Sequence, residues 1–335
     1  MRKLTALLLA LTLMFSLVIA VSADEPTETP TKVTLKKLYT VTGATGDGVF
    51  PNETLEFIST PDQSNPATAN LSIANLVVDG VDGELEITLP DYAVIGKYIY
   101  TISEKPGNTK GVTYTDATID VTVLVSYDDN HNLKSELFLT QKVSEDSTTK
   151  VDTFNNTYEL GKLNVTKVVE GNLGSRDAEF DMTVTFTSDK PVKSDITYVD
   201  GNTTGTISYV DGWTNANNQY TATANIKVKH GETVSFTNIP VGVTYKVEEN
   251  TAHILGENET MDPNSPATED YKVAYTNGTG TITVAGEAPQ LVTVTNTKET
   301  TVETGIVLDS MPYVLILTAA VIGMAALMGK KRYEV

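Results

Sequence analysis

Lysine, glutamate and asparagine residues fall on apolar strand faces in two parts of this chain. Alternate side chains of a strand point to the same face, so Lys37 shares a face with Val33 and Leu35. Lysine is almost never fully buried without a partner. The same parity places one residue of each type on the inward face of two successive units. These residues are Lys37, Glu104 and Asn156 in the first unit, and Lys167, Glu249 and Asn296 in the second.

These three residue types can form an amide bond between side chains. Burial disfavours the charged forms of both an amine and a carboxylic acid. A neutral amine is a nucleophile, and a carboxylic acid can pass protons between that amine and a leaving group. We therefore predict a Lys–Asn isopeptide bond in each unit, formed with loss of ammonia and without a cofactor. A structural lysine–glutamate pair satisfied by asparagine is the alternative, and the repetition of the trio argues against it.

The strands that carry these residues are predicted from alternation. Val, Thr, Ile and Tyr dominate, and turn residues recur about every ten positions, which favours two tandem Ig-like, antiparallel β-sandwiches. We place a joint between the units at Glu159-Leu160-Gly161. The predicted strands are 33–42, 54–59, 84–89, 97–104, 117–127, 133–143 and 151–158, then 163–170, 179–188, 204–210, 220–229, 233–238, 244–249, 271–276, 280–284 and 290–297.

Both ends of the 335-residue chain carry targeting patterns. Arg2 and Lys3 precede an apolar run at 4–20, and Ala23 ends a small-residue cleavage site, which together predict a secretory signal. Residues 311–329 form an uncharged apolar run long enough to span a bilayer. The Lys330-Lys331-Arg332 cluster that follows is expected on the cytoplasmic side.

Charge and composition narrow the possible functions. A net charge of −19 argues against nucleic-acid binding through phosphates and suits an extended extracellular protein. The chain has no cysteine, so no disulfide can stabilise it. The three histidines are scattered among turns and suggest neither a metal site nor a hydrolase triad. The segment Asp128–Asn132 lacks the glycine and glutamate of a calcium loop and is predicted to be a hairpin turn.

Three stretches give the chain a specific family resemblance: Leu163–Met182, Gly231–Glu249 and the tail Glu303–Leu317. With them the chain resembles the two-domain major (backbone) pilins of sortase-assembled Gram-positive pili, built from CnaB-like sandwiches. The resemblance implies Lys37–Asn156 and Lys167–Asn296 bonds, promoted by Glu104 and Glu249. The sequence departs from the family at Val294 and Lys298, where Phe and Tyr are usual.

The resemblance also implies covalent assembly by a sortase. Thr304-Gly305 stands where such an enzyme would cleave, although Glu303 replaces the usual proline. Lys150, six residues before Asn156, is the implied acceptor amine. The implied partners are a sortase, other copies of the chain, and peptidoglycan or accessory pilins, at the cell surface.

The expected organisation is a signal peptide (1–23), a disordered spacer (24–32), two isopeptide sandwiches (33–160 and 161–299), a sorting motif (300–305), and a spanning segment with a basic tail (306–335).

Other functional classes stay open at this point. A monomeric wall-anchored adhesin or stalk would use the same sandwiches, and the reaction of Lys150 with Thr304 distinguishes it from a polymer subunit. Lys150 itself can be read as ordinary solvated surface. A secreted enzyme has little support, because the sequence shows no catalytic set beyond the self-modifying trios.

Overall fold

The computed structural model describes residues 30–144, 147–201, 203–250, 270–283 and 288–299, together with Ala320. The all-β prediction is confirmed: in the described residues between 30 and 299, every element is a strand. Within the described part of the chain, no helix is long and apolar enough to cross a membrane. The predicted signal cleavage at Ala23, the sorting residues Thr304 and Gly305, and the spanning segment, Ala320 apart, lie outside the described residues.

The first half of the chain forms strands that alternate between buried and exposed side chains. They are β1 (Lys32–Thr42), β2 (Thr54–Pro61), β3 (Ser72–Ile73), β4 (Leu76–Val77), β5 (Asp82–Thr88), β6 (Gly96–Lys105), β7 (Val112–Thr113), β8 (Thr118–Tyr127), β9 (Leu133–Ser144), β10 (Ser147–Thr149) and β11 (Thr153–Glu170). The second half forms β12 (Phe180–Ser188), β13 (Ile196–Asp200), β14 (Thr203–Ile207), β15 (Thr214–Ala216), β16 (Gln219–Val228), β17 (Thr233–Pro240), β18 (Thr244–Glu249), β19 (Lys272–Thr276), β20 (Thr279–Thr281) and β21 (Gln290–Thr297). The short strands β3, β4, β7, β10 and β15, and also β13, were not predicted.

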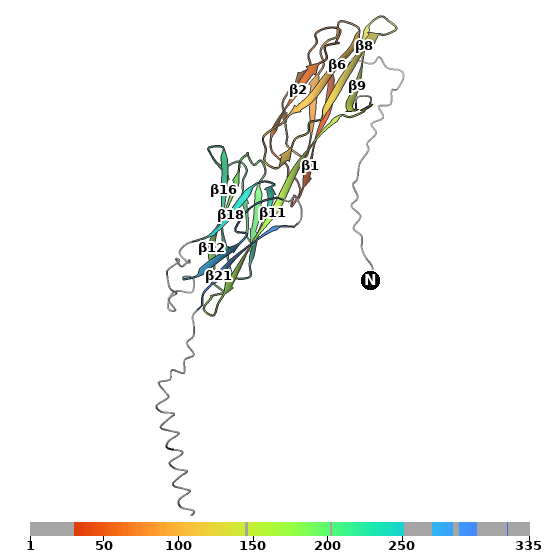
Figure 1. The fold of residues 1–335 in the computed structure, drawn as a ribbon. Helices are drawn as coiled ribbons and strands as arrows, with labels where there is room; N and C mark the ends of the chain where they lie inside the picture. The colour runs from red at the N-terminus through yellow and green to blue at the C-terminus, as the bar shows by residue number, and fades with distance from the viewer. Residues whose placement is uncertain are drawn as a thin grey trace, which may run out of the picture.

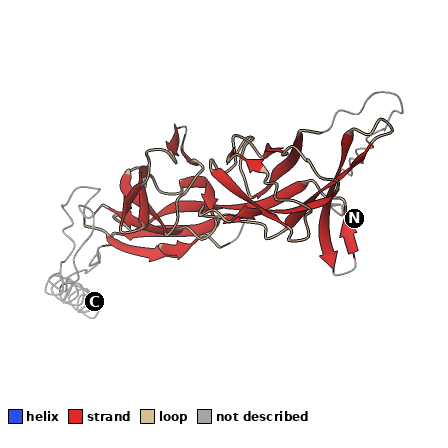
Figure 2. Cartoon of the chain, turned by 90° about the horizontal axis from the view of Figure 1, so that it is seen from above, coloured by secondary structure: helices blue, strands red, loops and turns tan. Residues whose placement is uncertain are grey.

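Two sandwiches follow each other along an elongated molecule (Figures 1 and 2). One large sheet runs through both, in the order β14-β13-β17-β11-β1-β5-β3, with β7 and β21 also paired to β11. A sheet with the order β10-β9-β8-β6-β2-β4 completes the first sandwich, and β15-β16-β12-β18-β20 completes the second. One layer of each sandwich therefore belongs to a single shared sheet, in which β11 takes part in both sandwiches.

The two strands predicted at 151–158 and 163–170 are wrong as separate elements, because β11 continues through residues 159–161 as one strand of 18 residues. Both Leu160 and Gly161 are buried, so the alternation shifts by one residue there, and the pairing with β17 shows a register shift between Gly161 and Leu163. Glu159 donates its N–H to Gly111 O and accepts one from Val241. These backbone partners keep the chain extended, since buried peptide groups must be hydrogen-bonded.

The predicted antiparallel pairing holds for most strands but fails at two pairs of neighbours. The first and last strands of each sandwich are parallel neighbours: β1 with β11, and β11 with β21. Parallel neighbours require a long connection, which the intervening strands of each sandwich provide. This arrangement brings the two ends of each sandwich side by side.

Two hydrophobic cores lie on either side of the bulge in β11. The inward-facing side chains of β8, at alternate positions from Ile119 to Val125, are at most 2% exposed and belong to the first core. Phe180 and Phe186 of β12 are fully buried in the second. The first core draws on residues up to Leu160 and the second on residues from Leu163 onward. The domain limits given above stay a prediction, with these cores as their support.

Polar contacts connect the two sandwiches beside β11. Asn238 is 4% exposed and its side chain pairs with the backbone of Thr45, accepting from Thr45 N at 2.7 Å and donating to Thr45 O at 3.2 Å. Asn238 has a φ of 61°, a conformation that asparagine tolerates better than most residues. Further contacts are Tyr158–Ser194, Lys110–Asp189, Asn52–Lys193 and Lys110–Pro191.

Replacing Asn238 with glycine should loosen this junction. Glycine accepts the positive φ, so Asn238→Gly removes the two hydrogen bonds without adding backbone strain. Each is worth about 1 kcal/mol, and amide hydrogen exchange at Thr45 should accelerate roughly five- to tenfold. Asn218→Gly is the matched control, because Asn218 has a φ of 60° in an exposed turn. Equal exchange at Thr45 in both variants would contradict a coupling role for Asn238.

Candidate functional site

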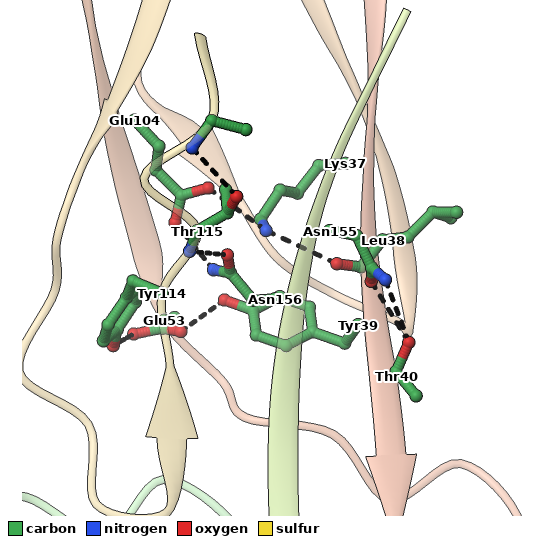
Figure 3. Close-up of polar contacts among 11 residues, drawn as sticks. Lys37, Leu38, Tyr39, Thr40, Glu53, Glu104, Tyr114, Thr115, Asn155 and Asn156 are labelled. Atoms are coloured by element: carbon green, nitrogen blue, oxygen red, sulfur yellow. Dashed lines mark hydrogen bonds and ion pairs between the residues drawn. The ribbon is translucent and has the colours of Figure 1, made fainter. Parts of the chain in front are cut away.

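The first trio lies between the two layers of the first sandwich (Figure 3). Lys37 on β1, Glu104 on β6 and Asn156 on β11 are 1%, 5% and 0% exposed. Lys37 Nζ lies 3.1 Å from Glu104 Oε2 as an ion pair, and Asn156 Nδ2 donates to Glu104 Oε1 at 2.6 Å. The carboxyl group thus contacts both the amine and the amide nitrogen.

The second trio repeats this arrangement. Lys167 on β11, Glu249 on β18 and Asn296 on β21 are 0%, 4% and 0% exposed. Lys167 Nζ donates to Glu249 Oε2 at 2.8 Å, and Asn296 Nδ2 donates to Glu249 Oε1 at 2.6 Å. The structure therefore brings together the three predicted residues of each unit, with one carboxylate oxygen on each nitrogen.

Strand register explains why the lysine and the asparagine meet. In the first sandwich Tyr39, two residues after the lysine, is the partner of Asn156. In the second, Val169, again two residues after the lysine, is the partner of Asn296. The same offset in two parallel pairs directs both side chains toward the glutamate of the facing sheet. Because β11 takes part in both pairs, it carries the asparagine of one trio and the lysine of the other.

Desolvation prepares both lysines for a reaction of the neutral amine. Burial lowers the pKa of Lys37 below its usual value, although the charge and hydrogen bond of Glu104 oppose it. Burial lowers the pKa of Lys167 to about 8, against the opposing hydrogen bond and charge of Glu249. Aromatic rings cover the amines: Lys37 Nζ is 4.7 Å from the centroid of Tyr39, and Lys167 Nζ is 4.5 Å from that of Phe180. A lower pKa increases the fraction of each lysine present as a nucleophile.

A cluster of hydroxyl groups next to the first trio was not predicted from the sequence. Glu53 accepts hydrogen bonds from Tyr39, Tyr114 and Thr109. The residue after Tyr114 contacts the trio directly, because Thr115 N donates to Asn156 Oδ1 at 2.9 Å. Tyr39 was the one residue whose position in the sequence could have indicated this cluster. It shares the inward face of Lys37, and a buried tyrosine hydroxyl usually has a hydrogen-bond partner.

The remaining predicted residues have simpler surroundings. Lys150 is exposed and lies between β10 and β11. Asp128 accepts the N–H groups of Asn130 and Asn132 in the turn between β8 and β9. Lys298, one of the departures from the family pattern, is 2% exposed, and its Nζ lies 5.7 Å from the ring centroid of Tyr271. Within the described ranges no group of three or more His, Cys, Asp or Glu could hold a metal ion.

The fold and the two trios define a class: tandem β-sandwich proteins with a buried Lys–Glu–Asn trio bridging the first and last strands of each sandwich. Residues 31–159 match the family model described as a Spy0128-like isopeptide containing domain, and residues 161–298 match a domain of unknown function (DUF7601). The chain therefore resembles a backbone pilin, as its sequence motifs indicate, and its first sandwich is the part that matches the Spy0128-like domain model.

Individual relatives agree with this assignment. The chain is 27% identical over 239 residues to a protein named "Pilin" from Streptococcus pyogenes serotype M1, covering 70% of this chain and 68% of that protein. Two solved structures of major pilins from Streptococcus pyogenes share the fold. One, of the T3.2 protein, matches with a TM-score of 0.51 and 21% identity over 80% of this chain and 98% of the other. The second matches with a TM-score of 0.51 and 20% identity over 81% and 99%.

The lowered pKa of Lys167 predicts how stability depends on pH when the trio is not cross-linked. In Asn296→Ala the lysine should titrate near pH 8 when folded and near 10.5 when unfolded. Between these values the unfolded state binds more protons, so the free energy of unfolding should rise with pH, by on the order of 2 kcal/mol across the window. Below pH 8 Lys167 is protonated in both states, so the folded state bears the full cost of burying a charged amine.

Urea unfolding at several pH values in this window measures the effect. The control is the double variant Lys167→Met with Asn296→Ala, which has no amine to titrate and whose other groups are unchanged. The difference between the free energies of unfolding of the two proteins should become smaller as the pH rises. Parallel pH profiles would contradict a lowered pKa for Lys167.

Proposed function

We propose that each sandwich cross-links itself through a Lys–Asn isopeptide bond, Lys37–Asn156 in the first and Lys167–Asn296 in the second. The observation that carries this proposal is the repeated trio, buried between parallel first and last strands at the same register. In each trio one carboxyl group contacts both the attacking amine and the leaving amide nitrogen.

The chemistry balances without a cofactor. The neutral lysine Nζ attacks the asparagine Cγ, and a tetrahedral intermediate forms. The glutamate accepts a proton from Nζ on one oxygen and delivers a proton to Nδ2 from the other, so the Cγ–Nδ2 bond breaks and ammonia leaves. An amide joins Nζ to Cγ. Fixed positions in the core supply the high effective concentration that this reaction needs.

The biological role that this chemistry supports best is that of a structural subunit of a cell-surface pilus. Support comes from the pilin relatives and from the match of residues 31–159 to an isopeptide-containing domain family. In this proposal a sortase cleaves after Thr304 and joins it to the amine of Lys150 on another copy, and the chain is otherwise not an enzyme. Lys150 is exposed, as an acceptor requires.

Mass spectrometry tests the internal bonds. The chain from Asp24 to Thr304 should weigh less than its sequence by two molecules of ammonia. Glu104→Ala and Glu249→Ala should each restore the mass of one, because each removes the proton carrier of one trio. Asp120→Ala is a suitable control, since that carboxylate pairs with Thr101 on the same sheet and contacts no trio. An unreduced mass in the wild-type chain would refute self-cross-linking.

Polymerisation is tested by expressing the full chain with its own sortase. The wild type should give a ladder that resists boiling in detergent. Lys150→Arg should reduce the ladder to monomer and leave both internal bonds intact, because arginine stays protonated and is a poor nucleophile. Lys162→Arg serves as the control at another lysine nearby in the chain. A ladder that persists in Lys150→Arg would assign the acceptor to another lysine, and no ladder in the wild type would favour a wall-anchored monomer.

A further inference from the structure

The carbonyl oxygen that must gain charge in the first bond-forming step already has a donor. Thr115 N donates to Asn156 Oδ1 at 2.9 Å, and Asn156 Nδ2 points at Glu104 (Figure 3). The amide of Asn156 is therefore fixed with its nitrogen toward the proton carrier and its oxygen toward a backbone N–H. Such donors stabilise charge that develops on a carbonyl oxygen in acyl transfer, at distances of about 2.7–3.1 Å.

Resting on the proposed self-cross-linking, we propose that the Thr115 N–H is an oxyanion donor for the Lys37–Asn156 reaction, and that Glu53 is the residue that positions it. When Lys37 Nζ attacks Asn156 Cγ, the electron pair of the C=O bond moves onto Oδ1. The Thr115 N–H stabilises this charge. The pair returns to the C=O bond when Nδ2 leaves as ammonia.

Glu53 fixes the loop between β6 and β8 that carries Thr115. Tyr114 Oη donates to Glu53 Oε2 at 2.6 Å, and Thr109 Oγ1 donates to the same oxygen at 2.7 Å. Thr109 N in turn donates to Tyr114 Oη at 3.1 Å. Two points of the loop are thus bound to one carboxylate, and one of them is the residue directly before Thr115.

The other oxygen of Glu53, Oε1, binds the tyrosine that lies beside the attacking lysine. Tyr39 Oη donates to Glu53 Oε1, and the ring of Tyr39 lies against Lys37 Nζ. Burial, followed by the hydrogen bond to Glu53, raises the pKa of Tyr39 and of Tyr114 well above the usual value, so both hydroxyls stay protonated donors. Glu53 therefore connects the strand of the lysine to the loop of the oxyanion donor.

The Tyr114 side chain packs closely against the backbone at Gly107. A side chain on Gly107 would place its Cβ 2.5 Å from Tyr114 Oη and 2.7 Å from Cζ, closer than real contacts. Thr115 is held as well by its own turn, since Ala117 N donates to Thr115 Oγ1 at 3.1 Å. The N–H of Thr115 is consequently preorganised toward Asn156 before any reaction.

The second trio supplies an internal reference in the same molecule. Its glutamate and lysine lie in the other sandwich and, among the described residues, form no hydrogen bond with the Glu53 cluster. Any change confined to the Glu53 cluster should therefore alter the rate of the Lys37–Asn156 bond and not that of Lys167–Asn296.

Tyr114→Phe and Glu53→Gln test the proposal in the chain from Asp24 to Thr304. After a short pulse of cell-free synthesis, peptide mapping follows the two cross-linked peptides separately over time. Misplacing the donor should slow the Lys37–Asn156 bond about tenfold or more, with the Lys167–Asn296 rate unchanged. Tyr98→Phe is the matched control, because it also removes one buried tyrosine hydrogen bond, to Val94 O, in the same sandwich.

Circular dichroism on each variant shows whether it is folded, which separates a loss of stability from a loss of positioning of the Thr115 N–H. The reaction occurs within the folded domain, so a variant that stays folded and still cross-links slowly has lost positioning. Wild-type rates in both Tyr114→Phe and Glu53→Gln would overturn this inference and leave the proposed self-cross-linking intact. Equal slowing of the two bonds, or slowing by Tyr98→Phe, would overturn it too. A wild-type chain without either bond would instead refute the proposed function and this inference with it.

A backbone change tests the donor directly. An ester in place of the amide between Tyr114 and Thr115 removes the N–H and keeps every side chain. Loss of one oxyanion donor typically costs about 10²–10³ in rate, and a slowing of that order is expected for the first bond only. An unchanged rate in the ester would overturn the role of Thr115 whatever the side-chain variants show.

Discussion

The structure depends on two charged pairs buried in apolar cores. Removing an ion from water costs several kcal/mol even after relaxation, and a buried pair recovers this only with good geometry. Both trios meet that requirement by giving each carboxylate oxygen one nitrogen, and both lysines still have a lowered pKa because desolvation dominates. An amide in place of the ammonium removes this cost permanently. The unreacted trio thus carries a desolvation cost, and the proposed product is an uncharged link without that cost.

The cross-link and the topology support each other. Each proposed bond joins the first strand of a sandwich to the last, which lie in parallel as neighbours. Lys37–Asn156 would close a loop of about 120 residues, for which the loss of unfolded-state entropy is worth roughly 4–5 kcal/mol by analogy with disulfides. In a chain without cysteine, the proposed bond supplies a constraint that no disulfide can. Because it closes nearly the whole domain into one loop, a single bond restricts most of the residues in the unfolded state.

The sequence was sufficient for the trios because period-two alternation decides which side chains face inward, and Lys37, Glu104 and Asn156 each interrupt an apolar row. Alternation does not decide which strands are neighbours, so the parallel pairing was missed. The shift in alternation at Leu160 and Gly161 was read as the end of one strand and the start of another, because a sequence shows the same shift for a bulge within a single strand. The Glu53 cluster could not be predicted, because Glu53 and Thr109 precede or lie between strands and meet only through tertiary packing.

The continuous strand β11 determines how tension would pass through the proposed polymer. Tension applied at Lys150 enters the chain three residues before β11 and follows the backbone past Asn156 to Lys167. The second cross-link then transfers it to Asn296, close to Thr304. Without that bond the segment from Lys167 to Asn296, about 130 residues, could extend by on the order of 400 Å. The first cross-link is not part of this path, so the two similar bonds would have different roles. Lys167–Asn296 would carry the tension, and Lys37–Asn156 would keep the rest of the first sandwich attached to the strand under tension.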